Sequence, residues 1–168
     1  MNKRYVRIFV FLAAFLCLLP LWGCEENVSK EEPYSFTVDG VTLTPGAKAK
    51  DALAALAGRN PVVSVGKSCL GGVDGEDVNY VYAGFHVQTF RQSEGHPDEE
   101  IRWVILDDDS VATDQGITIG AEASAVKAAY GAPATESDSL LLYQRGKTTL
   151  RFGVREGRVV SVSFTVAE

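Results

Sequence analysis

Alternation of large apolar residues with more polar ones over residues 148–166 constrains the fold more than any other feature. The apolar positions of the two alternating runs are Thr148, Leu150, Phe152 and Val154, then Val160, Val162, Phe164 and Val166. A period of two residues is typical of strands that bury one face in an antiparallel sheet. Hairpin turns are predicted near Arg145-Gly146 and Glu156-Gly157. This part of the chain is therefore predicted to be a meander that begins with "LLLYQRG".

Two segments of similar pattern lie 74 residues apart, measured from Gly46 to Gly120. The first is "GVTLTPGAKAKDALAALAG" and the second is "GITIGAEASAVKAAYG". Each contains a glycine, a β-like triplet, a second glycine, an alanine-rich run and a closing glycine. The pattern predicts an internal repeat.

The alanine-rich runs are predicted to be short helices. In the first, Thr44 suits the N-cap, Pro45 suits the first turn and Gly58 suits the residue after the last turn. In the second, Glu122 favours the helix dipole from the first turn, and Gly131 ends the helix.

Two more strands are predicted between these helices. They are "NYVYAGFHVQTF" and "IRWVILDDDS", joined by the polar loop from Arg91 to Glu100. The predicted fold class is therefore α+β, with two tandem units that each place a helix before an antiparallel sheet. We expect the units to span residues 36–110 and 111–168.

Residues 1–23 have the plan of a secretory signal peptide. Lys3, Arg4 and Arg7 form a basic region, and an apolar run from Ile8 to Trp22 follows it. The run is shorter than the roughly 20 residues of a bilayer-spanning helix, and Pro20 interrupts it. A transmembrane anchor is the weaker alternative.

Leu21-Trp22-Gly23-Cys24 resembles the lipobox of bacterial lipoproteins. The resemblance implies that Cys24 carries a diacylglyceryl group and becomes the N-terminus after cleavage. Two acyl chains hold a protein stably on a bilayer. We expect residues 24–35 to be the lipidated cysteine and a charged tether. An unmodified Cys24 beside an ordinary cleavage site is the alternative.

Composition excludes some classes of function. The formal net charge of −6 becomes −9 without residues 1–23, which carry three basic residues and no acidic one. Such a chain lacks the basic surface that nucleic acids and anionic headgroups require. Cys17 leaves with the signal and Cys24 is lipidated, so Cys69 would have no disulfide partner.

The region from about residue 40 to residue 165 resembles a group of Firmicute lipoproteins of unknown function. The motifs that carry the likeness are "SC" with a glycine-rich turn, "YVYAGF", "DDSVAT", "GITIG" and "YG". The arrangement is also similar to β-lactamase-inhibitor-protein-like tandem repeats, in which short helices back a sheet whose open face binds a partner protein. The chain departs from this likeness in "AKAKDALAALAG" and in the loop from Arg91 to Glu100. The resemblance implies a fold and a location, with no catalytic residues and no cofactor.

The candidate functional site is a sheet face. If residues 79–90 form one strand, Tyr80, Tyr82 and His86 share a face, and Trp103 on the next strand can join them. Aromatic and hydrogen-bonding side chains together are typical of protein-binding patches. The alternative is that these aromatic side chains cover the sheet or fill a second core.

Two other candidates have simpler explanations. Cys69 and His86 could pair as nucleophile and base, but 17 residues separate them and no third group is indicated, so a buried thiol is favoured. Asp107, Asp108 and Asp109 could bind a cation, but their spacing is not that of a calcium loop, and a strand end followed by a turn explains them. No metal site is predicted.

The favoured function is an extracytoplasmic lipoprotein that binds another protein and is not an enzyme. It would be anchored in the cell membrane through Cys24, with an extracytoplasmic protein as its partner and no nucleic acid. Inhibition or regulation of an envelope enzyme is the alternative, and an enzyme built on Cys69 is a further one.

Overall fold

The computed structural model describes residues 32–68, 74–92 and 99–167. The order of elements along the chain is β1, Phe36–Val38; β2, Val41–Leu43; α1, Lys50–Ala55; the 3₁₀ turn η1, Ala57–Arg59; β3, Val62–Lys67; β4, Gly75–Val81; β5, Phe85–Gln92; β6, Glu100–Leu106; α2, Ala123–Tyr130; β7, Thr135–Ser137; β8, Leu140–Arg145; β9, Thr148–Arg155; and β10, Arg158–Val166. Strands therefore dominate, and the two α-helices have only 6 and 8 residues.

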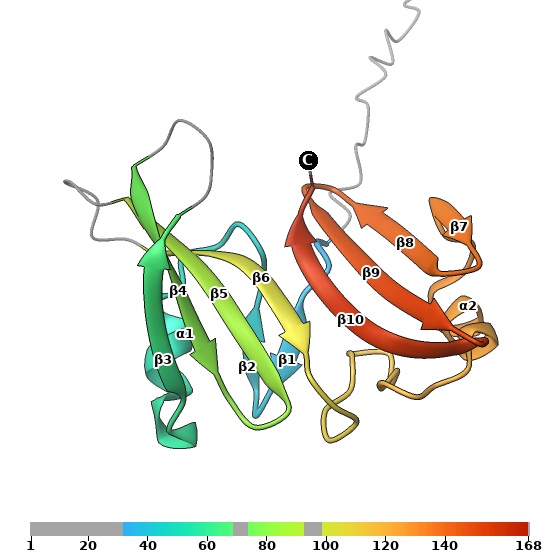
Figure 1. The fold of residues 1–168 in the computed structure, drawn as a ribbon, viewed down its shortest axis with the longest axis horizontal. Helices are drawn as coiled ribbons and strands as arrows, with labels where there is room; N and C mark the ends of the chain where they lie inside the picture. Colours follow the sequence, from blue (N-terminus) through green and yellow to red (C-terminus); the bar gives the residue numbers. More distant parts are fainter. Residues whose placement is uncertain (1–31, 69–73, 93–98, 168) are drawn as a thin grey trace, which may run out of the picture.

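All strands after α1 join one antiparallel sheet of eight strands in the order β3-β4-β5-β6-β10-β9-β8-β7 (Figure 1). From one edge to the centre the strands are β3, β4, β5 and β6, and from the other edge to the centre they are β7, β8, β9 and β10. There, β6 pairs with β10, and Leu106 lies opposite Val162. This pairing leaves only two free edges instead of four, and unpaired edges are a liability for a sheet.

The predicted fold class is wrong. The molecule is mostly β, and it does not consist of two α+β units that each place a helix before its own sheet. The sequence patterns concern neighbouring strands, whereas the contact between β6 and β10 joins residues more than fifty positions apart. Because local alternation says nothing about which distant strands pair, two sheets were predicted where one is formed.

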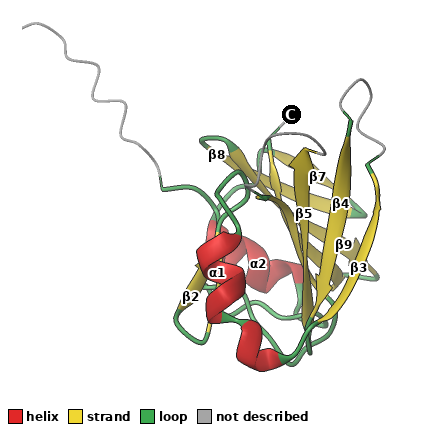
Figure 2. Cartoon of the chain, turned by 90° about the vertical axis from the view of Figure 1, so that its left-hand side faces the viewer, coloured by secondary structure: helices red, strands yellow, loops and turns green. Residues whose placement is uncertain are grey.

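The core lies on one face of this sheet. Helices α1 and α2 and the small hairpin of β1 and β2 all cover that face (Figure 2). Phe36 of β1 is 1% exposed, and its ring lies 5.1 Å from the ring of Phe85 and 6.2 Å from that of Phe164. The opposite face of the sheet has no helix over it among the described residues.

The meander predicted from residue 140 onward is observed. Two-residue turns join β8 to β9 and β9 to β10, and Glu156 and Gly157 have φ values of 52° and 75°. The apolar positions of β9 are all buried. In β10 a bulge between Val159 and Ser161 leaves Val160 44% exposed, and Val166 at the end of the strand is only partly buried.

The predicted boundaries of the first helix are wrong. It begins at Lys50, six residues after the predicted cap at Thr44, and the left-handed residue that ends η1 is Asn60 instead of Gly58. The intervening residues pair with β6 instead, through a bridge between Lys48 and Glu100. The second helix ends before Gly131, as predicted.

The two glycine-bounded segments make the same contact with the sheet. The N–H of Gly46 donates to the carbonyl of Ile101 at 2.7 Å, and the N–H of Gly120 donates to that of Val159 at 2.8 Å. Their φ values are 86° and 89°, in the region that favours glycine. Each glycine therefore turns the chain toward the helix that follows, at the point where the chain is hydrogen-bonded to a central strand. That strand is β6 for Gly46 and β10 for Gly120.

Candidate functional site

The segment predicted as a single strand is a hairpin. β4 ends at Val81, β5 begins at Phe85, and the N–H of Tyr82 donates to the carbonyl of Phe85 at 2.9 Å. Gly84 has a φ of 86°, and a Cβ atom at this position would collide with the hydroxyl of Ser110. Glycine is thus required here, and the turn that it makes reverses the chain in the middle of "NYVYAGFHVQTF".

The reversal separates the four residues predicted to share a face, so that part of the site prediction is wrong. Tyr82 is 5% exposed and stacks on Phe85 in the core, with ring centroids 4.8 Å apart. Its hydroxyl has no hydrogen-bond partner among the described residues, and burial raises the pKa of Tyr82. Tyr80 pairs with Val87, which is buried on the same side. Both tyrosines therefore belong to the covered face.

His86 and Trp103 lie on the opposite, uncovered face. Their strand partners, Ile105 and Gln88, share that face because directly opposed residues of antiparallel strands point the same way. Trp103 is 47% exposed, which is large for an indole in the middle of a sheet. Of the predicted surface residues, these two can meet a partner.

Two cross-strand rows run through these residues and define what we call the open face. One row holds Ser64, Asn79, Gln88, Trp103, Thr165, Thr149 and Gln144. The other holds Val62, Val81, His86, Ile105, Ser163, Arg151, Leu142 and Thr135. Apart from His86, these rows contain one ionisable side chain, Arg151, although 23% of the chain is charged.

The polar members of these rows were not predicted. Sequence patterns assign no role to Gln88, and they place Ser163 and Thr165 only in the polar half of an alternating strand. The signal that could have identified them is the near absence of Lys, Glu and Asp at those alternating positions. Solvent-exposed sheet faces ordinarily need such charges for solubility, whereas the centre of a protein interface is depleted of them.

At one end of the open face, His86 contacts the acidic turn. Its Nδ1 lies 2.8 Å from Oδ1 of Asp107, and both side chains are partly exposed. Oδ1 of Asp108 accepts a hydrogen bond from the N–H of Ser110 at 2.8 Å. The bond from the Ser110 hydroxyl, and then this backbone bond, lower the pKa of Asp108. Asp107 and Asp108 thus have protein partners, and the described residues contain no group of three or more side chains suited to a metal ion.

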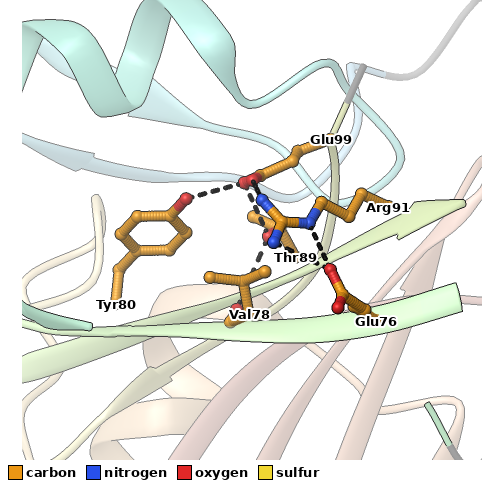
Figure 3. Close-up of polar contacts among 6 residues, drawn as sticks. All are labelled: Glu76, Val78, Tyr80, Thr89, Arg91 and Glu99. Carbon is orange, nitrogen blue, oxygen red and sulfur yellow. Dashed lines mark hydrogen bonds and ion pairs between the residues drawn. The ribbon is translucent and has the colours of Figure 1, made fainter. Parts of the chain in front are cut away.

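A polar cluster lies on the covered face and joins residues of β4 and β5 to Glu99, just before β6 (Figure 3). The carboxylate of Glu99 accepts hydrogen bonds from the hydroxyls of Tyr80 and Thr89, at 2.8 and 2.9 Å. Arg91 lies 3.5 Å from Glu99 and bonds Glu76 at 2.7 Å. Burial, and then the bond to Glu99, raise the pKa of Tyr80 to about 12. Every polar group of the cluster has a partner within it, so the cluster stabilises the fold.

A polar pocket of about 280 Å³ lies where the described chain begins. Arg145 lies over the ring of Tyr34, 4.4 Å from its centroid, and the pocket wall also includes Tyr130 and Asp114. Two carboxylates, Glu32 and Asp114, line it against one cation, Arg145, so the pocket holds no cluster of cations that would bind an anion.

Two of the residues considered above, Cys24 and Cys69, lie outside the described residues. No helix of residues 32–68, 74–92 and 99–167 is long and apolar enough to cross a bilayer. No protein-family model matches the chain, no curated protein is detectably similar to it, and no solved structure matches its fold.

Proposed function

We propose that the chain is a lipid-anchored extracytoplasmic protein whose β-rich domain binds another protein through the open face. The observation that carries this proposal is the composition of the two rows, with Trp103 at their centre. An aromatic side chain surrounded by uncharged polar and aliphatic residues has the make-up of an interface core.

The shape of the face supports a protein partner over a small ligand. Its side chains lie on one face of a continuous eight-stranded sheet, whereas small molecules bind in concave sites that enclose most of their surface. A sheet face that spans eight strands offers room for an interface of ordinary size, about 800 Å² on each partner.

The anchor is proposed from Cys24 and its apolar leader. The tether from Cys24 reaches the domain near Tyr34, whose N–H donates to the hydroxyl of Thr148 at 2.7 Å. This bond fixes the start of the domain at the hairpin of β8 and β9. At no more than about 3.4 Å per residue, the tether keeps that hairpin within roughly 35 Å of the bilayer.

The anchor is tested with Cys24→Ser. The native chain is expected to stay with the membrane fraction after an alkaline wash and to incorporate labelled palmitate. The variant should lose the label and either leave the membrane or keep its uncleaved leader, which its mass reveals. A variant that has lost the leader and still resists the wash would contradict lipid anchoring.

The binding face is tested by photo-crosslinking in the bacterium that encodes the chain. A photoreactive phenylalanine analogue replaces Gln88 or Thr165 on the open face, and Asp51 on α1 serves as the matched position on the other side. We expect one discrete adduct from both open-face positions and none from Asp51. The same adducts from all three positions, or none from any, would overturn the proposal.

The captured partner then gives a quantitative test. Trp103→Ala should weaken its binding to the purified chain at least tenfold, which corresponds to about 1.4 kcal/mol, because a central aromatic anchor is lost. If the captured protein is an enzyme whose activity falls on binding, the regulatory alternative is favoured. Unchanged affinity would exclude the open face as the binding surface.

A further inference from the structure

The two edges of the eight-stranded sheet differ in a way that the open face does not explain. One edge is β7, which has three residues and carries Glu136 in an ion pair with Lys127 at 2.9 Å. Short, polar and charged edges resist pairing with other chains. The other edge is β3, with six residues, "VVSVGK", in which every residue is exposed. Only β7 has the ordinary protection of a sheet edge.

The valines of β3 are exposed on both faces of the strand. Val62 is 71% exposed on the open face, while Val63 and Val65 are 50% and 53% exposed on the covered face. The helices and the small hairpin therefore leave this edge uncovered, although they bury the apolar side chains of the covered face at the centre of the sheet, such as Val87, Val104 and Val162. Three valines with strong β propensity therefore lie on one edge strand with half or more of each side chain exposed.

The free hydrogen-bonding groups of β3 can be identified from its pairing with β4. The N–H of Ser68 donates to the carbonyl of Gly75 across that pair, so alternate residues before it, Gly66 and Ser64, also face β4. The N–H and carbonyl groups of Val63 and Val65 consequently point away from the sheet. Among the described residues, no strand lies beyond β3 to accept them.

We propose that two copies of this chain pair through β3, antiparallel about a two-fold axis at Ser64. In this register Val63 of each copy lies opposite Val65 of the other, and their N–H and carbonyl groups form two hydrogen-bonded pairs. The four valines form a continuous apolar patch on the covered face. On the open face, Ser64 meets its own equivalent and Val62 meets Gly66.

Charge makes a second copy a suitable occupant. The chain carries a net charge of −6, so most surfaces of two copies repel each other. The β3 strand contains no carboxylate, and its single charged residue, Lys67, falls outside the four valines and lies opposite no cation. This edge is therefore a place where two acidic molecules can meet without opposing like charges. A single strand pair buries less than a standard interface, so we expect a weak, concentration-dependent dimer.

Disulfide trapping tests the register. In the full chain carrying Cys69→Ser, Ser64→Cys places two thiols opposite each other at a Cβ separation of about 5 Å, and mild oxidation should link them. Ser137→Cys, an exposed serine on the β7 edge, is the matched control and should remain monomeric. Equal or slower linking of Ser64→Cys would overturn the proposal.

Mass measurements in detergent test the interface without a new thiol. The native chain should shift from monomer to dimer as its concentration rises. Val65→Pro removes an outward N–H that β4 does not use, and it should abolish the shift while the circular dichroism spectrum is retained. A native chain that is monomeric at every concentration would overturn the proposal, whether or not the proline variant folds. Neither result depends on a partner at the open face.

Discussion

Glu99 shows how single side chains hold the edge half of the sheet together. Its carboxylate accepts hydrogen bonds from Tyr80 on β4 and Thr89 on β5, and it contacts Arg91 further along β5. It stands one residue before β6. One acceptor therefore connects β4 and β5 to the start of β6, and its partners keep each of its oxygens hydrogen-bonded.

The raised pKa of Tyr80 makes the stability of the fold depend on pH at the alkaline end. A tyrosine whose folded pKa is about 12, against an ordinary value of 10, binds its proton more tightly in the folded state. The stabilisation is complete below pH 10 and is lost as the pH rises from 10 to 12, because the unfolded chain loses this proton first.

Comparison with Tyr80→Phe isolates that effect. The urea midpoint of the native chain should fall more steeply between pH 10 and 12 than the midpoint of the variant. Other groups that titrate in this range are common to both proteins and cancel in the difference. Parallel curves for the two proteins would show that Tyr80 has an ordinary pKa.

At the scale of elements, turns decided which predictions succeeded. The hairpins at Arg145-Gly146 and Glu156-Gly157 were predicted because a glycine interrupts a clear alternation there. The hairpin at Ala83-Gly84 is missed because strand-forming Tyr, Val and Phe residues lie on both sides of it and the alternation of residue types continues through the turn. That single miss moved Tyr80 and Tyr82 to the wrong face of the sheet, and with them half of the predicted site.

The turn between β9 and β10 is a place where the chain can be stabilised. Glu156 has a φ of 52°, which is unfavourable for a glutamate and well suited to asparagine. Glu156→Asn should therefore raise the free energy of unfolding by about 0.5–1 kcal/mol, since Asn-Gly favours this kind of two-residue turn. Urea denaturation measures the change, and Glu156→Gln, which removes the same charge at the same φ, is the control for the lost charge. A gain no larger than that of the control would show that the φ value of Glu156 carries no strain.

At the scale of the whole molecule, the pairing of β6 with β10 could not be predicted. Each half of the chain contains enough alternation to build a sheet of its own, and no residue pattern states that the last strands of the two halves pair. The candidate site depends on the same pairing, because both rows of the open face cross from β6 to β10. Sequence reasoning could therefore identify Trp103 and His86 but not the surface to which they belong.

The same pairing predicts that the domain unfolds as one body. Phe164 of β10 is 1% exposed and lies opposite Val104 of β6. Phe164→Ala should lower the free energy of unfolding by about 3–5 kcal/mol. The fluorescence of Trp103 on β6 and the far-ultraviolet circular dichroism should still report one common transition. Two separate transitions in the native chain would instead show that the halves are independent domains.

The central position of β10 also determines when the sheet can form during synthesis. Strands β3 to β6 and β7 to β9 are made first, but each set lacks the neighbour at its inner edge until residues 158–166 have left the ribosome. Because the pairing of β6 with β10 joins distant parts of the chain, the long loop between these two strands must close late. The sheet therefore stays incomplete until β10 has been synthesised, and for the exported lipoprotein that we propose, such a delay would suit passage through a narrow channel in the unfolded state.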